Sequence, residues 1–217
     1  MDAIIQAVSV YAIPVLLAIT LHEAAHGYIA LRCGDQTAKR AGRITLNPVK
    51  HIDPVGTVLV PLSIVLTSAA VGAGVFLFGW AKPVPVDFSR LNDPRRDMRY
   101  VAFAGPGANF IMAFGWAAMF KGLMLTGYPE PFFMEMAKAG IVVNLVLAAL
   151  NLLPILPLDG GRILITYLPT KAAYNFSKTE QYGLLILIAL LLLNVLPILI
   201  QPVVTFGLGV LSSLFNI

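Results

Sequence analysis

The residues best suited to chemistry in this sequence are two histidines around a glutamate, in the set His22-Glu23-Ala24-Ala25-His26. Histidines four positions apart lie on one face of an α-helix, one turn above each other, so both imidazoles can reach one zinc ion at roughly 2.0–2.1 Å. Glu23, beside the first histidine, can accept a proton from the water that attacks a substrate at such a site. The spacing therefore predicts a zinc site with a general base next to it.

The surroundings of this set are apolar, because it lies near the end of a hydrophobic run from Ile4 to Leu31. That run is long enough to cross about 30 Å of hydrocarbon at a rise of 1.5 Å per residue. An ionisable side chain within a membrane span costs on the order of 3 kcal/mol. The alternative to a zinc site is a chance cluster of polar residues that face a protein interior and have no function. The cost of such a cluster in a membrane favours a functional site.

The composition is that of a membrane protein. The chain has 217 residues, of which 58% are hydrophobic and 12% charged, and soluble domains carry about 25% charged residues. We expect an all-α polytopic membrane protein in which residues 1–217 form a single membrane-embedded domain. The basic residues lie in loops beside apolar runs, so no basic face is available for nucleic acid. The first run carries the histidine set, so we expect a retained span and not a cleaved signal peptide.

Four further hydrophobic runs follow the first. They cover Val55–Trp80, Tyr100–Leu125, Phe132–Leu153 and Tyr182–Ile200, and the last stretch, Val203–Ile217, is too short to cross independently. The Val55–Trp80 run is broken by Pro61, Gly72, Gly74 and Gly79. It can cross the membrane once, or it can dip in and return.

Between these runs the sequence predicts short non-helical pieces. Pro83 and Pro85 favour an extended segment over Trp80–Val86, and the alternation in Arg43–Leu46 favours a short strand. Asp87–Arg99 is expected to be a charged loop. The Tyr100 run contains Gly105-Pro106-Gly107-Ala108-Asn109, which predicts a helix break with a buried amide, whether for packing or for function.

A third metal ligand is expected from the end of the Phe132–Leu153 run. There Pro154 and Pro157 unwind the helix, and Asp159 stands before two glycines on irregular backbone. Zinc held by two histidines commonly takes a carboxylate as third ligand. Asp159 is the only aspartate in an apolar setting, so we expect it to complete the set.

Two other residues could take part in metal chemistry. His51 lies in a polar loop, where a histidine is more often a hydrogen-bonding group than a ligand, and its role stays open. Cys33 is the only cysteine, so the chain can form neither an internal disulfide nor an all-cysteine metal site. A small apolar residue at a helix end is the simpler explanation for Cys33.

Charge suggests how the chain is oriented. If Val55–Trp80 crosses once, the histidines and Asp159 leave the membrane on opposite faces, and the 15 lysines and arginines divide 7 to 8. If it dips and returns, 13 of the 15 share one face, with only Lys121 and Lys138 opposite. The second arrangement shows the positive-inside bias and places the site towards the cytoplasm.

Taken together, these segments resemble the site-2 protease family of intramembrane zinc metalloproteases, peptidase family M50. The histidine set matches the HExxH helix of that family, and Asn151–Gly161 resembles its N-x-x-P-x-x-P-x-D-G-G segment. Gly105 to Asn109 resembles its G-P-x-x-N helix, and the resemblance spans about Leu16 to Leu164. The Gly79–Val86 piece is similar to compact bacterial members without PDZ or CBS domains.

The resemblance implies a three-helix catalytic core from the first, Tyr100 and Phe132 spans. It implies one zinc ion per chain on His22, His26 and Asp159, with Glu23 as general base and Asn151 as a catalytic residue near the reacting carbonyl. It also implies a multi-pass protein of a bacterial cell membrane. Such a protein would be an endopeptidase that acts in the lipid bilayer on transmembrane protein or peptide substrates, as in regulated intramembrane proteolysis. The Val55–Trp80 insert departs from the plainest core and leaves the route of substrate access open.

Two other functions are compatible with the same residues. A metal-ion transporter could use the histidines and the aspartate as a transit site, and a non-catalytic membrane scaffold could retain them without turnover. No inverted repeat is evident in the sequence, and a glutamate beside the first histidine fits hydrolysis better than transport. The sequence names neither the substrate nor the oligomeric state.

Overall fold

The computed structural model describes residues 2–59, 81–127 and 130–217, and within these ranges the regular structure is helical, with no β-strand. The α-helices are α1 (Asp2–Arg32), α2 (Thr37–Arg40), α4 (Pro94–Leu125), α5 (Pro131–Asn151), α6 (Asp159–Tyr167), α7 (Thr170–Ser177), α8 (Gly183–Leu192) and α9 (Val195–Phe215). The short 3₁₀ or π turns are η1 (Pro48–His51), η2 (Pro54–Leu59), η3 (Phe88–Arg90) and η4 (Lys178–Tyr182).

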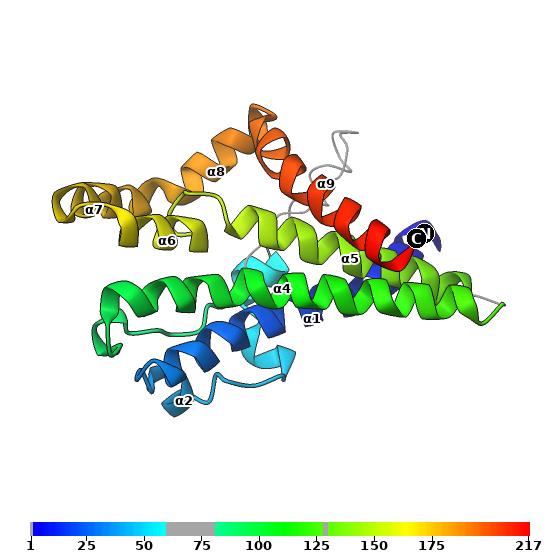
Figure 1. Cartoon of the computed structure of the whole chain (residues 1–217), viewed down its shortest axis with the longest axis horizontal. Helices are drawn as coiled ribbons and strands as arrows, with labels where there is room; N and C mark the ends of the chain where they lie inside the picture. The colour runs from blue at the N-terminus through cyan, green and yellow to red at the C-terminus, as the bar shows by residue number, and fades with distance from the viewer. Residues whose placement is uncertain (1, 60–80, 128–129) are drawn as a thin grey trace.

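Within the described ranges, four helices are long and apolar enough to cross a membrane: Val8 to the end of α1, α4, α5 and α9. The expected all-α polytopic membrane protein is thus confirmed. Helices α1, α4 and α5 contact one another and run side by side, while α9 lies against α5 (Figure 1). The three-helix core is therefore present, with the C-terminal helix added to it.

Small residues bring the helices of this core together. Ala113 and Ala117 of α4 are buried against Ile141 and Leu145 of α5, and Leu211 of α9 completes the cluster. Without a hydrophobic force between helices in lipid, close packing at small residues is what holds spans together. The result is a rigid frame that fixes the rotation of each helix.

Helix α4 begins earlier than the sequence predicts. Asp93 caps it by accepting a hydrogen bond from the Arg96 N–H at 3.1 Å, and Pro94 occupies the first turn, where no backbone N–H is needed. The expected charged loop over Asp87–Arg99 is therefore wrong for its second half. The expected helix break is also wrong, because α4 continues through Pro106. The loss of one backbone hydrogen bond there is tolerated within the packed core.

The C-terminal region is divided at a different place from the one expected. The predicted span Tyr182–Ile200 is wrong, because α8 ends at Leu192 and α9 runs without a break from Val195 to Phe215. Asn194 makes the turn in a left-handed conformation with φ of 56°, which asparagine adopts more readily than most residues. Two prolines, at 197 and 202, lie inside α9 without ending it.

The loop between α1 and α4 is extended in part. The expected short strand at Arg43–Leu46 is wrong, because residues 44–46 form bends and the Arg43 guanidinium, not a strand amide, donates to the carbonyl of Lys82. The Lys82 N–H donates to the His51 carbonyl at 3.0 Å, so these two residues lie side by side. Whether Val55–Trp80 crosses or returns concerns residues 60–80, which lie outside the described residues.

Candidate metal centre

Helix α1 brings the two histidines together on one face. The Nε2 atoms of His22 and His26 lie 3.0 Å apart, and the two rings meet nearly edge to face. Both side chains are largely shielded from solvent, with 9% and 12% of their side-chain surface exposed. The helical spacing therefore produces the paired imidazoles that the sequence predicts.

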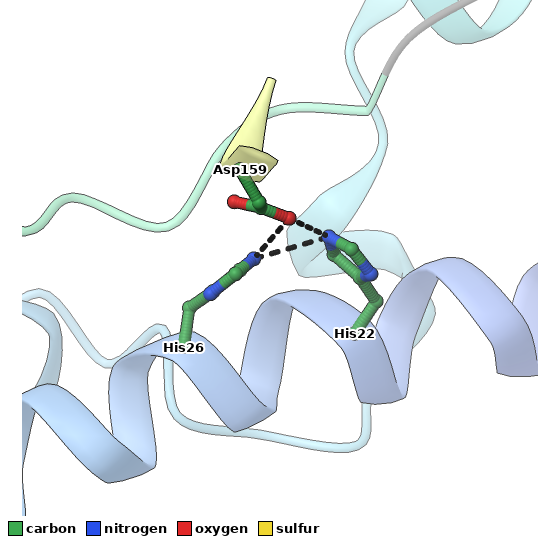
Figure 2. Close-up of side chains that lie close together, drawn as sticks. All are labelled: His22, His26 and Asp159. Atoms are coloured by element: carbon green, nitrogen blue, oxygen red, sulfur yellow. Dashed lines mark hydrogen bonds and ion pairs between the residues drawn. The ribbon is translucent and has the colours of Figure 1, made fainter. Parts of the chain in front are cut away.

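Asp159 approaches the same point from the start of α6. Its Oδ2 atom lies 3.3 Å from Nε2 of His22 and 3.4 Å from Nε2 of His26 (Figure 2). The chain unwinds between α5 and α6 and returns so closely that a Cβ at Gly160 would lie 2.2 Å from the Leu152 carbonyl oxygen. Only glycine fits there, which explains why the glycine pair follows the aspartate.

Two hydrogen bonds fix which ring nitrogens face the centre. Nδ1 of His22 lies 2.7 Å from Oδ1 of Asn109, and Nδ1 of His26 lies 2.7 Å from the Val101 carbonyl oxygen. Both partners are acceptors, so each Nδ1 carries the hydrogen and donates. Each Nε2 is then left with a lone pair directed at its neighbour, which is the tautomer that a metal ligand requires.

Three electron-rich atoms thus converge without a hydrogen between them. Oδ2 of Asp159 is buried and receives no hydrogen bond from any of the described residues. A carboxylate and two imidazole lone pairs repel one another unless a cation lies among them, so the donor set fits zinc.

Space for that cation exists because residue 105 is a glycine. A Cβ at Gly105 would lie 2.4 Å from Nε2 of His26 and 2.6 Å from Nε2 of His22. The backbone of α4 therefore forms one wall of the donor cluster. Among the described residues, these three side chains are the group whose donor atoms lie close enough together to hold a metal ion.

Asn109, the hydrogen-bond partner of His22, belongs to a network of buried amides. The sequence predicts only that the Asn109 amide is buried. The Nδ2 of Asn109 donates to Oδ1 of Asn144 at 2.9 Å, and Asn144 donates in turn to the Gly140 carbonyl at 2.8 Å. Both asparagines are fully buried. Since a buried amide needs its partners, two asparagines in neighbouring apolar helices were a signal that they meet.

Replacing Asn109 with leucine is expected to weaken zinc binding about ten- to a hundredfold, because the hydrogen bond that orients His22 is lost. Competition with a calibrated chelator on the purified protein measures this affinity. Asn109→Asp is the matched control, since a carboxylate oxygen can still accept from Nδ1. Equal affinities for wild type and Asn109→Leu would contradict the orienting role.

Glu23 is held by a contact that the sequence did not predict. Its Oε2 accepts a hydrogen bond from the Val84 N–H at 2.7 Å. Val84 belongs to the extended stretch after residue 80, and Pro83 and Pro85 on either side have no N–H to donate. The structure thus places the expected general base one residue from a donor histidine, with one carboxylate oxygen fixed.

The remaining candidates have contacts of their own. Asn151 is the last residue of α5, and its Nδ2 donates to the Leu147 carbonyl at 3.0 Å, so its catalytic part stays a prediction. His51 is buried and Nε2 lies 3.0 Å from the Thr45 carbonyl oxygen, outside the donor group. Cys33 is half-buried and packs beside Ala30, and burial raises the pKa of its thiol, as in an unreactive cysteine.

Comparison with known proteins gives a consistent result. The model of Peptidase family M50 matches residues 130–195. The Bacillus subtilis protein YwhC, named as a candidate zinc metalloprotease, is 35% identical over 215 residues, which cover 94% of this chain and 90% of that protein. No solved structure matches the chain.

More distant relatives carry similar names. Rip2 of Mycolicibacterium smegmatis, also named as a candidate zinc metalloprotease, is 29% identical over 82% of this chain and 64% of its own length. A zinc metalloprotease of Methanocaldococcus jannaschii, MJ0392, is 31% identical over 52% of this chain and 34% of its own length.

Proposed function

Because this chain belongs to peptidase family M50 and is a zinc metalloprotease, we propose that it hydrolyses peptide bonds of membrane-spanning proteins within or near the bilayer. One zinc ion per chain on His22, His26 and Asp159 is part of the proposal. The observation that carries it is the convergence of these three donor atoms inside a bundle of apolar helices. A site in that position can be reached by a chain that is itself in the membrane.

Each residue of the site has a distinct task in this proposal. Zinc, when bound, polarises the scissile carbonyl and makes the attacking water more acidic. Glu23 accepts the proton of that water and later donates it to the leaving amine. The amide of Asn151 donates to the oxygen on which negative charge develops. Asn109 and the Val101 carbonyl keep the imidazoles in the required tautomer.

The substrate must present an extended backbone. In a helix its carbonyl groups are bonded within the helix, so a spanning segment has to unwind before it can react. The extended stretch at Trp80–Val86 is the candidate template against which the unwound segment lies, by main-chain pairing; the described part begins at Ala81. The polar end of the bundle around Asp159–Arg162 is the candidate inlet for water.

The site is proposed to face the cytoplasm of a bacterial cell. If Val55–Trp80 dips into the membrane and returns, 13 of the 15 lysines and arginines lie at the end of the bundle that carries the site, against Lys121 and Lys138 at the other end. The positive-inside rule assigns the richer end to the cytoplasm. The contacts of His22 and His26 with Asp159 support a common end, because they bring the C-terminal half of α1 next to the start of α6.

No observation on the described residues favours a metal-ion transporter or a non-catalytic scaffold. The matched family and the named relatives are peptidases, which supports hydrolysis over transport. A scaffold would have no need of a carboxylate tied beside a paired-histidine site.

Cleavage of a single-span substrate by the purified protein in liposomes tests the proposal. We expect cleavage within or next to the span, loss of cleavage with a zinc chelator and recovery on adding back stoichiometric zinc. Mass spectrometry of the products locates the cut. A soluble, unfolded peptide serves as comparison. Zinc-dependent cleavage of that peptide alone would retain the metalloprotease and overturn its action in the membrane.

A further inference from the structure

The extended stretch of residues 81–87, here called the bridging segment, is held by groups from other parts of the chain. The Lys82 N–H donates to the His51 carbonyl at 3.0 Å, and the Asp87 N–H donates to Oδ2 of Asp35 at 2.8 Å. Between these two contacts the Val84 N–H donates to Glu23 at 2.7 Å. Among the described residues this segment has no neighbouring strand, so its backbone groups need such partners.

Arg43 also holds the bridging segment, and the burial of its charged side chain is unusual. Its guanidinium is buried, with only 8% of the residue exposed. In the part of the chain that the structure describes, it forms no ion pair with a carboxylate, and its Nε has no hydrogen-bond partner. A buried cation without a counter-ion is costly, so its contacts call for an explanation.

Those contacts are directed at the bridging segment. One terminal nitrogen of Arg43 donates to the Lys82 carbonyl at 2.8 Å and, more weakly, to the Pro83 carbonyl at 3.4 Å. The Pro83 carbonyl and the Val84 N–H belong to the same planar peptide unit. A single peptide therefore lies between the guanidinium of Arg43 and the carboxylate of Glu23.

Side-chain packing holds the same peptide from another direction. Val84 is buried, and its Cγ1 lies 3.0 Å from where a Cβ on Gly27 would be. Gly27 is four residues after Glu23 and so occupies the next turn on the same face of α1. The bridging segment is thus pressed onto the helix that carries the proposed base, at the level of that base.

We propose that Arg43 is a positioning residue for Glu23, acting through the Pro83–Val84 peptide. The cation fixes and polarises this peptide, and the Val84 N–H then holds Oε2 of Glu23 in one orientation. Oε1 is the oxygen that takes up the proton. The inference rests on the proposed function, in which Glu23 is the general base.

Steady-state kinetics of Arg43→Gln provide the first test. We expect kcat to fall about ten- to a hundredfold, as for a misplaced catalytic group, while KM stays within about twofold and zinc content is unchanged. Arg43→Lys retains one donor and is expected to recover part of kcat. Arg40→Gln, an exposed arginine three residues earlier, is the matched control. An unchanged kcat, or a rise in KM alone, would overturn the proposal.

A double-mutant cycle separates positioning from general support of the fold. In Glu23→Asp the carboxylate is too short to reach the Val84 N–H, so adding Arg43→Gln should cost little more. Equal losses in both backgrounds would show that Arg43 acts on the structure as a whole and would refute the proposal.

Amide hydrogen exchange gives a readout that needs no cleavage. Because prolines have no N–H, the exchange of residues 82–85 reports only Lys82 and Val84. Arg43→Gln is expected to accelerate exchange in this stretch, and Arg40→Gln is not. Unchanged exchange would overturn the contact between Arg43 and the bridging segment. Failure of the wild type to cleave would instead refute the proposed function and leave this measurement valid.

Discussion

Replacing Gly105 with alanine is expected to remove nearly all zinc from the purified protein. The added methyl group would lie 2.4 Å from Nε2 of His26 and 2.6 Å from Nε2 of His22. A metal ion bound by both nitrogens has to occupy this same space. A zinc ion lies at about 2.0–2.1 Å from each histidine nitrogen, so the methyl group and the ion exclude one another. Elemental analysis of metal per chain measures the effect.

Gly107→Ala is the matched control for this change. It lies on the same helix, and its Cβ would come no closer than 3.5 Å to another atom, on the ring of Phe103. We expect this variant to keep its zinc, since both substitutions alter helix propensity alike. Full zinc content in Gly105→Ala would refute the placement of the metal against α4.

Replacing Glu23 with glutamine is expected to abolish cleavage while zinc stays bound. The amide oxygen can still accept the Val84 N–H, so the local structure is preserved, but the side chain can no longer take up a proton. General base catalysis typically contributes about a hundred- to ten-thousandfold, and kcat should fall by that factor. Cleavage rates and zinc content are measured on the same preparations.

Glu135→Gln controls for the loss of a carboxylate. Glu135 is exposed and pairs with Lys138 on the surface of α5, so this variant should cleave like the wild type. Wild-type cleavage by Glu23→Gln would show that another group is the base. Loss of zinc from Glu23→Gln would show that Glu23 supports the metal site itself.

The sequence predicts the parts of the site that depend on local geometry. His22 and His26 share a face because helical spacing puts them there. Asp159 reaches them because the prolines unwind the chain after α5; the expected irregular backbone at Asp159 itself is wrong, since α6 begins at this residue and includes both glycines. The partners of these residues depend on how distant helices are rotated against one another. The sequence could not predict that the Val101 carbonyl binds His26, since every residue has a backbone carbonyl.

The same division holds for the fold. Apolar runs indicate the spans, but their ends depend on competing signals. Asp93 and Pro94 form a helix N-cap and first turn, and this signal for a helix outweighs the signal for a loop that the charged residues after it give. Near the C-terminus the sequence suggests a break at the prolines at 197 and 202, yet the chain turns at Asn194. A residue in the left-handed conformation can reverse the chain direction, whereas a proline within a packed helix only removes one hydrogen bond.

The division of the donor atoms between α1 and α6 has a consequence for biosynthesis. His22 and His26 leave the ribosome early, and Asn109 and Val101 can hold their rings once α4 has been inserted. The third donor is supplied only after translation has passed residue 159. A nascent chain therefore lacks a complete donor set throughout most of its insertion, so it cannot bind zinc through all three donors while it is still being made.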